Sequence, residues 1–243
     1  MAQMYQKKIL VLAPECDVHE KMSLSSILNH TQQMGNEHLD NLGITYDKMV
    51  EDGMVFLVAK SLVTITRRPR MGERIILTTI PKKPKGAQFI RDTVFDAENG
   101  ERLIEVSIAW LLVEPASHRI LRPNAFDVYG FDMYPNEGEY ITGYKIKKPQ
   151  GTGALSFRQV RYTDLDYNLH VNNAVYADIV CDAVPSQVML SQEIAQFGIL
   201  YQKEAKLNQE IRLEVIPQQE NKEYYIGGQA DGGKCFEAQI KFQ

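Results

Sequence analysis

The densest group of polar residues with chemical potential lies between residues 161 and 176, just ahead of an apolar helical pattern. Within this stretch, Asp166, Asn168 and His170 alternate with bulkier residues. If the stretch is extended, this period of two puts a carboxylate, an amide and an imidazole on one side. Such a group can take a proton from water and orient a substrate, which is the chemistry of acid–base hydrolysis.

The residues that follow predict a helix N-terminus beside this group. Asn172 or Asn173 can cap a helix through Val175, Ile179 and Ala183, which Pro185 interrupts. The free N–H groups and the positive dipole end at a helix N-terminus polarise a carbonyl group. They also stabilise the negative charge that develops on its oxygen during acyl transfer. The stretch therefore predicts attack on an acyl carbonyl carbon.

The motif Asp-x-Asp-x-x-x-His-Val-Asn-Asn-x-x-Tyr, here residues 164–176, resembles the signature of hotdog-fold thioesterases. The length and the duplicated organisation resemble the acyl-acyl carrier protein thioesterases of bacteria and plant plastids. This resemblance implies a catalytic set of Asp166, Asn168 and His170, completed by a Glu about 34 residues later, which here is Glu204. It also implies a free fatty acid product and a buried acyl channel formed largely by the first half of the chain.

One position departs from the family pattern. Plant members often carry a Cys directly after the catalytic Glu, whereas this chain has Ala205 there. A covalent cysteine route at that position is therefore excluded.

Two stretches, residues 71–81 and 207–217, repeat each other at an offset of 136 residues. Both alternate apolar and polar residues between Gly or Asn turns, which predicts antiparallel strands. A helical pattern precedes each strand set. In the first half it covers residues 24–42, with Ser23 as a candidate N-cap and Gly43 as the end. The repeating unit is thus a strand, a long helix and about four strands.

We expect an α+β fold of two tandem hotdog units, each a long helix wrapped by a curved antiparallel sheet, joined as a pseudo-dimer. Residues 1–113 would form the N-terminal unit with the substrate channel, and residues 151–243 the catalytic C-terminal unit. Residues 114–150 hold four of the ten prolines, which predicts a connector.

The two halves differ in the residues that carry the chemistry. Aligning Asp17 with Asp164 places His19 opposite Asp166, Lys21 opposite Asn168, Ser23 opposite His170 and Arg68 opposite Glu204. The first half thus lacks the catalytic set. We therefore expect a single active site in the second half and a binding role for the first.

Basic residues gather between positions 67 and 85, where the only acid is Glu73 and the local charge is +6. Solvated hairpin ends would explain this cluster. A docking surface for an acyl carrier protein and its phosphopantetheine phosphate would also explain it, because guanidinium groups suit phosphate. The candidate docking residues are Arg67, Arg68, Arg70, Lys82, Lys83 and Lys85.

The composition narrows the class of protein. The chain has 243 residues and a net charge of −4, which argues against general attraction to nucleic acid. Three widely spaced cysteines without a CxxC motif fit reduced thiols, and no export signal or membrane-length apolar stretch occurs. His30 and His38 lack partners at metal-ligand spacing. We expect a cytoplasmic monomer or homodimer that uses no metal or organic cofactor.

These features predict a thioesterase that hydrolyses fatty acyl-acyl carrier protein. Acyl-CoA is a competing substrate because both thioesters share the phosphopantetheine arm. A non-catalytic acyl-binding hotdog module is the alternative from another class. The general base is open between Glu204 and His170, and Asp166 either orients His170 or itself acts on the substrate. Asn168 would orient substrate or water.

Overall fold

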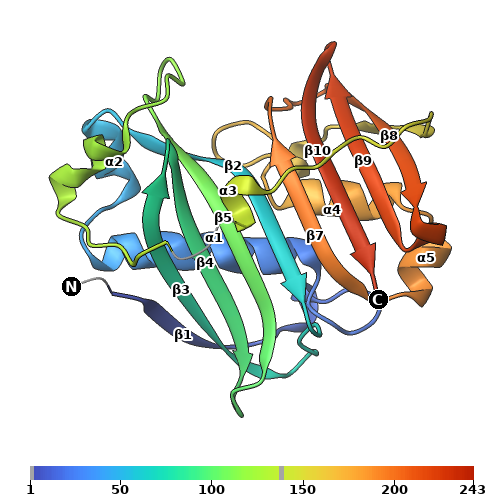
Figure 1. Cartoon of the computed structure of the whole chain (residues 1–243), viewed down its shortest axis with the longest axis horizontal. Helices are drawn as coiled ribbons and strands as arrows, with labels where there is room; N and C mark the ends of the chain where they lie inside the picture. The colour runs from blue at the N-terminus through green and yellow to red at the C-terminus, as the bar shows by residue number, and fades with distance from the viewer. Residues whose placement is uncertain (1–2, 137–139) are drawn as a thin grey trace.

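The computed structural model describes residues 3–136 and 140–243, and within them ten strands form one antiparallel sheet. The strand order is β1-β3-β4-β5-β2-β7-β10-β9-β8-β6 (Figure 1). Strands β2 and β7 pair antiparallel in the middle and join the strands of the two halves. The sheet is therefore continuous through both halves, and the predicted α+β class is confirmed.

The elements follow the expected repeat. The first half contains β1 (Tyr5–Leu10), a 3₁₀ turn (Ala13–Glu15), α1 (Leu24–Asn41), α2 (Tyr46–Glu51), β2 (Val55–Ile65), β3 (Arg74–Lys85), β4 (Gln88–Ala97) and β5 (Arg102–Val113). A 3₁₀ segment (Pro123–Tyr129) and α3 (Tyr140–Gly143) lie between the halves. The second half contains β6 (Ala154–Gln159), a 3₁₀ turn (Tyr162–Asp164), α4 (Val175–Ala183), α5 (Ser186–Ser191), β7 (Ile194–Tyr201), β8 (Glu210–Gln218), a 3₁₀ turn (Gln219–Asn221), β9 (Glu223–Ala230) and β10 (Gly233–Phe242).

The two helical patterns end as their sequences predict. The Ser23 hydroxyl accepts the N–H of Ser26 at 3.2 Å and caps α1, and Gly43 takes a left-handed φ of 76° just past its end. Leu42, expected on the apolar face, is instead 43% exposed because it follows the last helical turn. In the second half, Pro185 separates α4 from α5, so the predicted long helix is in two parts.

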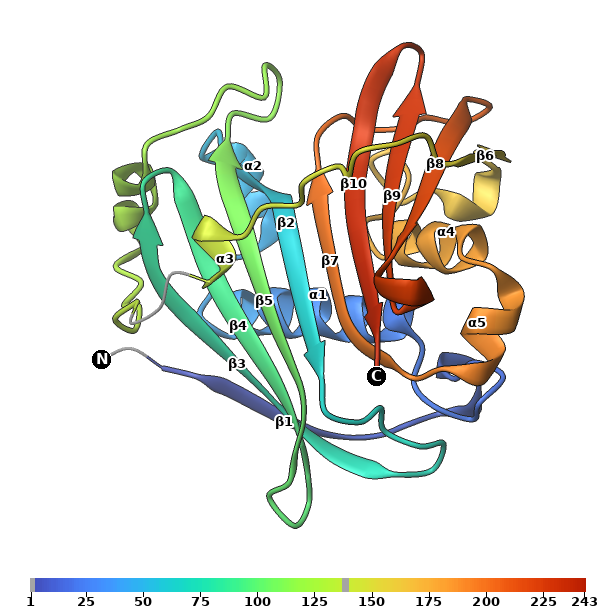
Figure 2. The same ribbon diagram turned by 45° about the vertical axis from the view of Figure 1, so that its right-hand side comes forward.

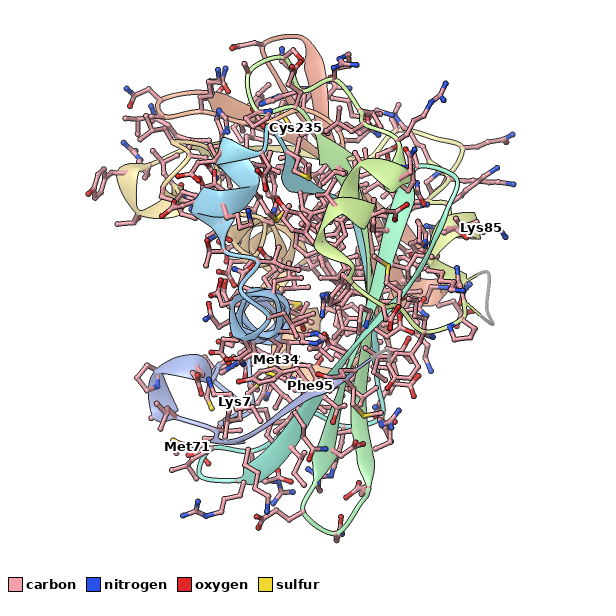
Figure 3. All side chains as sticks on the ribbon, turned by 90° about the vertical axis from the view of Figure 1, so that its left-hand side faces the viewer. Lys7, Met34, Met71, Lys85, Phe95 and Cys235 are labelled. Atoms are coloured by element: carbon pink, nitrogen blue, oxygen red, sulfur yellow. The ribbon has the colours of Figure 1, made fainter. Side chains whose placement is uncertain are left out.

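Helices α1 and α4 lie side by side on one face of the sheet (Figures 1 and 2). Fully buried residues fill the layer between helices and strands, including Met34 of α1 and Phe95 of β4, which Figure 3 shows close together. Burying such side chains stabilises a fold by roughly 1.5–3 kcal/mol each. Within the described part of the chain, no helix has both the length and the apolar composition needed to cross a membrane.

The segment between β5 and β6 crosses the opposite face of the sheet (Figure 2). Lys60 of β2 holds it there, because its Nζ donates to the carbonyl oxygens of Thr142 at 3.0 Å and Tyr144 at 3.4 Å. The Tyr144 ring lies directly on Gly198 of β7, where an added Cβ would stand 2.1 Å from the phenol oxygen. Gly198 is thus required because the Tyr144 ring lies against the backbone of β7, and not because the chain turns there.

We predict that Gly198→Ala lowers the free energy of unfolding by about 1–3 kcal/mol, because the methyl group must displace the Tyr144 ring. Denaturant unfolding of the purified protein measures this loss. In a Tyr144→Ala background, where the ring is gone, the same substitution should cost less than about 0.5 kcal/mol. An equal cost in both backgrounds would contradict the contact.

Candidate active site

Residues 165–171 form a tight hairpin, and the predicted extended lead-in to the helix is wrong. Leu165 and Val171 form an antiparallel bridge, and the Asp166 N–H donates to the His170 carbonyl at 2.9 Å. The Leu169 N–H closes the turn onto the Asp166 carbonyl at 3.0 Å, with Leu169 at a left-handed φ of 64°. This is the three-residue hairpin loop in which a turn is followed by a left-handed residue.

The hairpin separates the three residues that were expected to share one side. The Asp166 Oδ1 accepts the N–H of Asn168 at 2.8 Å, which is the usual role of Asp at the start of such a turn. Asn168 lies at the exposed tip, whereas Asp166 and His170 stand at the base and are partly buried. One Asp166 oxygen therefore has a structural role, and Asn168 is apart from the base of the hairpin.

His170 meets Glu204, as the spacing predicts. The His170 Nε2 lies 3.2 Å from the Glu204 Oε2, with side-chain exposures of 22% and 37%. Backbone pairing fixes this contact, because the Val171 N–H donates to the Ala205 carbonyl at 2.9 Å and His170 bridges Lys206. Two residues 34 positions apart are thus held together beside solvent.

The turn before α4 leaves one backbone donor unpaired, three residues along the chain from His170. Asn172 caps the preceding turn, since its Oδ1 accepts the Ala174 N–H at 2.8 Å and its carbonyl accepts the Val175 N–H at 2.9 Å. The carbonyl of Asn173 accepts the Tyr201 hydroxyl at 2.9 Å, whereas its N–H meets no acceptor among the described residues. That N–H is available to polarise a carbonyl group.

Tyr176 is a residue whose role sequence reasoning missed, although it ends the motif. Its hydroxyl accepts the Ala205 N–H at 3.2 Å, which ties α4 to the segment that carries Glu204. Burial raises the pKa of this phenol, and the nearby charges of Glu204 and Asp166 raise it further. The neutral hydroxyl therefore stands within electrostatic range of both carboxylates.

The first half forms the same hairpin, but its residues align with those of the second half two positions away from the expected alignment. Cys16 bridges Met22, and Lys21 bridges Arg70, as Leu165 bridges Val171 and His170 bridges Lys206. The equivalent pairs are Asp17 with Asp166, His19 with Asn168, Lys21 with His170 and Arg68 with Glu204. The expected alignment of Asp17 with Asp164 is thus wrong, whereas Arg68 opposite Glu204 is confirmed.

Ion pairs occupy the position in the first half that corresponds to the His170–Glu204 pair. Arg68 is only 3% exposed and pairs with Asp17 and, at 3.5 Å, with Glu193 from the second half. Lys21 reaches the same Glu193 at 2.6 Å. These charges bind the two halves to each other and leave no acid–base pair there.

The basic cluster does not form one surface. Arg67 pairs with Glu73 and Glu101, each at 2.9 Å. Arg67, the buried Arg68 and the exposed Arg70 all precede β3. Lys82, Lys83 and Lys85 stand at the other end of that strand. Eight steps of extended strand from Arg74 to Lys82 separate the two groups by roughly 27 Å, so the expected single docking surface is wrong.

The lysine end of β3 and Glu204 lie at the same end of the sheet. Lys82, Ile90, Ala109, Lys60 and Leu200 pair in one row across β3, β4, β5, β2 and β7. Four antiparallel pairings separate β3 from β7, so both strands run in the same direction. Lys83 follows Lys82 and Glu204 follows Leu200 along the chain, so both lie beyond this row at the same end of the sheet. Four strand spacings put them about 20 Å apart.

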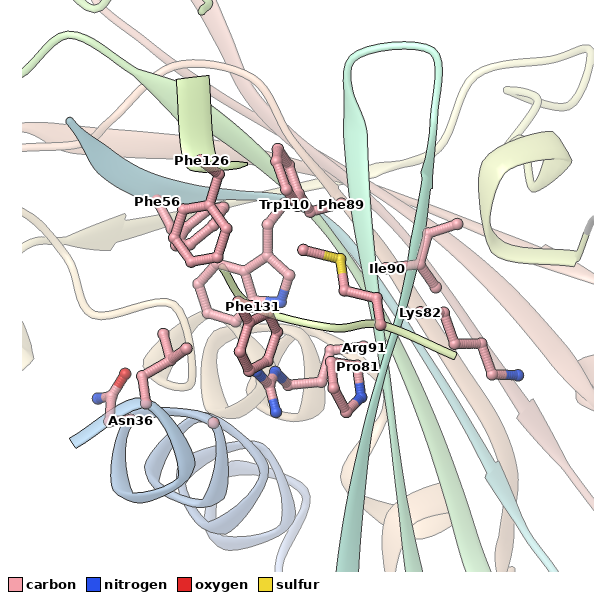
Figure 4. A pocket seen from close by; sticks show the side chains of 13 residues that line it. Asn36, Phe56, Pro81, Lys82, Phe89, Ile90, Arg91, Trp110, Phe126 and Phe131 are labelled. Carbon is pink, nitrogen blue, oxygen red and sulfur yellow. The ribbon is translucent and has the colours of Figure 1, made fainter. Parts of the chain in front are cut away.

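A pocket of about 60 Å³ opens in the first half, between α1 and the sheet (Figure 4). Five aromatic rings line it, together with Gly35, Asn36 and Leu39 of α1 and the charged Arg91; the rings are those of Phe56, Phe89, Trp110, Phe126 and Phe131. None of its lining residues belongs to the His170–Glu204 cluster. In residues 3–136 and 140–243, no group of three or more His, Cys, Asp or Glu is placed to hold a metal ion.

Known structures share this fold. A 12:0-ACP thioesterase from Umbellularia californica aligns with a TM-score of 0.86 at 18% identity, covering 99% of this chain and 97% of that one. An acyl-ACP thioesterase from Bacteroides thetaiotaomicron aligns with a TM-score of 0.82 at 15% identity, covering 99% and 98%. These matches confirm the expected double-hotdog architecture.

Sequence relatives point to the same group of proteins. An acyl-[acyl-carrier-protein] hydrolase from Cuphea viscosissima is 23% identical over 215 residues, covering 82% of this chain and 52% of that protein. A palmitoyl-acyl carrier protein thioesterase from Cuphea hookeriana is 24% identical over 215 residues, covering 82% and 51%. The chain thus spans about half the length of these curated relatives.

Two domain families match along nearly the whole chain. The family of the acyl-ACP thioesterase N-terminal domain matches residues 2–124. The family of the acyl-ACP thioesterase C-terminal domain matches residues 147–243, which include the hairpin, α4 and Glu204. The chain therefore belongs to the acyl-ACP thioesterase family.

Proposed function

We propose that this chain hydrolyses the thioester of fatty acyl-acyl carrier protein and releases a free fatty acid. The contact of His170 with Glu204 is the observation that carries this proposal, and the unpaired N–H of Asn173 follows three residues later in the chain. A base, a backbone donor and access to water are what hydrolysis of an acyl group requires. Family membership supports the choice of acyl carrier protein as the leaving group.

His170 and Glu204 act together as the general base. Water attacks the carbonyl carbon while the pair takes its proton, and the Asn173 N–H stabilises the charge on the carbonyl oxygen. The tetrahedral intermediate then collapses, the carbon–sulfur bond breaks, and the proton passes to the departing thiolate. The products are a carboxylic acid and the free thiol of the carrier, so water supplies every atom that is added.

Asp166 and Asn168 complete the site at its edge. Asp166 holds the hairpin that presents His170, and its carboxylate stands at the base of that hairpin. Asn168, at the tip, orients the substrate as it enters. The acyl chain occupies the aromatic pocket of the first half, since apolar walls suit its methylene groups.

Lys83 and Lys85 dock the carrier protein, because they stand at the same end of the sheet as Glu204, whereas Lys82 is held in an ion pair with Asp92. Arg67 and Arg68 are held in ion pairs and stabilise the fold instead. Cys16, Cys181 and Cys235 are unpaired, which fits the reducing cytoplasm as the place of the reaction.

We predict that His170→Ala and Glu204→Ala each lower kcat about 10²–10⁴-fold, because either loss breaks the base. If the two residues act as one unit, the double variant should be scarcely slower than the single variants. The assay follows thiol release from acyl-acyl carrier protein, with circular dichroism to confirm folding.

Glu210→Ala is the matched control, since it removes an exposed carboxylate at the start of β8. Its activity should stay within about twofold of the parent protein. Near-normal turnover in His170→Ala or Glu204→Ala would refute the site. Tight acyl binding by the parent protein without turnover would favour the non-catalytic module, and faster turnover of acyl-CoA would reassign the substrate.

Asp166 has a structural and an electrostatic role that two substitutions separate. We predict that Asp166→Ala costs about 1 kcal/mol of unfolding free energy because the turn loses its acceptor. Asp166→Asn keeps an Oδ1 acceptor and should stay within about 0.5 kcal/mol, yet it should lower kcat because the charge is gone. Full activity in Asp166→Asn would limit this residue to shaping the hairpin.

Carrier docking at the lysine end of β3 has a charge-reversal test. We predict that Lys83→Glu raises KM for acyl-acyl carrier protein several-fold and weakens its dependence on salt, with kcat little changed. Arg74→Glu, an equal change at the opposite end of the same strand, is the control and should alter KM little. Equal effects of both variants would show that only net charge matters.

A further inference from the structure

The two edges of the sheet differ in charge. Strand β1 lies at one edge and β6 at the other (Figure 2). The middle of β1 carries Lys7 and Lys8, and lysines on an edge strand oppose pairing with another chain. Strand β6 reads Ala-Leu-Ser-Phe-Arg-Gln, and its one charged residue, Arg158, pairs with Asp164 at 2.8 Å. The β6 edge therefore carries no free charge.

This edge also exposes large apolar side chains. Leu155 is 51% exposed and Phe157 is 61% exposed. Ser156, between them, pairs with the buried Leu213 of β8, so it faces the helix side of the sheet. Leu155 and Phe157 therefore share the other face. Exposed apolar residues on an edge strand favour the addition of a further strand.

The backbone of β6 directs free groups away from the sheet. The Val160 N–H donates to the Gln209 carbonyl of the neighbouring chain segment at 2.9 Å. Because hydrogen bonding alternates along an antiparallel strand, the even-numbered residues of β6 face β8. Leu155 and Phe157 therefore point their N–H and carbonyl groups outward. Among residues 3–136 and 140–243, these groups have no hydrogen-bond partner.

The free stretch is bounded at both ends. On one side, the backbone N–H of Gly153 donates to the Glu214 carboxylate. On the other side, the Arg158 NH1 donates to the Gln159 carbonyl at 3.2 Å. The outward groups that remain belong to the residues on either side of Ser156. An added strand must therefore be centred on Ser156 to use all of them.

We propose that β6 pairs antiparallel with β6 of a second copy of this chain, about a two-fold axis that passes through Ser156. In this register, Leu155 stands opposite Phe157 of the partner subunit, and the two residues exchange both N–H···O=C bonds. The two-fold axis repeats this pair, so every outward group of the free stretch is satisfied. The sheet then runs on through both copies.

A second copy fits this edge because the strand is complementary to itself. On one face, the pairing places an aliphatic side chain against an aromatic ring, which is a favourable cross-strand pair. On the other face, Ser156 meets its own copy, and Ala154 stands opposite Arg158 of the partner subunit, whose charge Asp164 already balances. No like charges meet, although each chain carries a net charge of −4. Two-fold pairing of identical chains is also the commonest form of assembly.

The first test measures mass against concentration by sedimentation equilibrium. An edge of six residues gives a small interface, so the mass should rise with concentration from that of one chain to twice that value. Phe157→Lys puts a charge on the edge and should weaken association about 10-fold or more. Val128→Lys makes an equal change at a 71% exposed position between the two halves and should leave association unchanged.

The second test reports the register. Opposite residues that share no hydrogen bond have Cα atoms about 4.5 Å apart, which a disulfide can span. Under mild oxidation, Ser156→Cys should therefore form a covalent dimer on a non-reducing gel. Ala154→Cys is the matched control, because it lies on the same strand and face but stands opposite Arg158 of the partner subunit. It should crosslink no more than the parent protein, whose own cysteines are unpaired.

The mass of a single chain at every concentration would overturn the proposal. Undiminished association in Phe157→Lys would do so as well, and so would equal crosslinking of Ala154→Cys and Ser156→Cys. Circular dichroism checks that each variant folds, and Leu155→Lys takes the place of Phe157→Lys if that variant does not. Hydrolysis is not measured in either test, so the pairing and the proposed function stand or fall separately.

Discussion

The backbone bridge between His170 and Lys206 is the constraint on which the site depends. It closes a hairpin of the motif onto the segment that follows β7, and with the Val171 to Ala205 hydrogen bond it sets Glu204 against the imidazole. The side chains alone would not hold this geometry, because an exposed ion pair contributes only about 0–1 kcal/mol. The contact is instead inherited from main-chain pairing, which does not change when the side chains change.

The first half shows this independence directly. The same hairpin and the same bridge are present there, but they present Lys21 and Arg68. Asp17 and Asp166 are common to both copies because both start the turn. The same backbone arrangement therefore holds ion pairs between the two halves at one end of the sheet, and the His170–Glu204 contact at the other end. The residues that differ between the copies set the charges that the bridge presents, and the shared Asp starts the turn.

Sequence reasoning succeeded where local chemistry determines structure and failed where two structures share one pattern. The Ser23 cap, the interruption at Pro185 and the meeting of His170 with Glu204 follow from side-chain chemistry and spacing. A polar residue at every second position fits both a strand and this hairpin, and Leu169 gives no signal for its left-handed conformation. The predicted alignment of the two repeats was wrong by two residues, because the hairpins share little more than one Asp.

Long-range placement was the other limit. The basic residues between 67 and 85 are neighbours in sequence, but an extended strand carries them to opposite ends of the sheet. Charges were read as a surface property, but the fold buries Arg68 against Asp17 and Glu193.

The aromatic pocket of the first half is built on the same sheet. Phe89 of β4 and Trp110 of β5 pair across the ladder, and both line the pocket. A mobile loop can reshape a pocket, but a ladder holds its side chains in place unless its hydrogen bonds break. If the pocket holds the acyl chain, as proposed, its depth is set by these rings and by the position of α1.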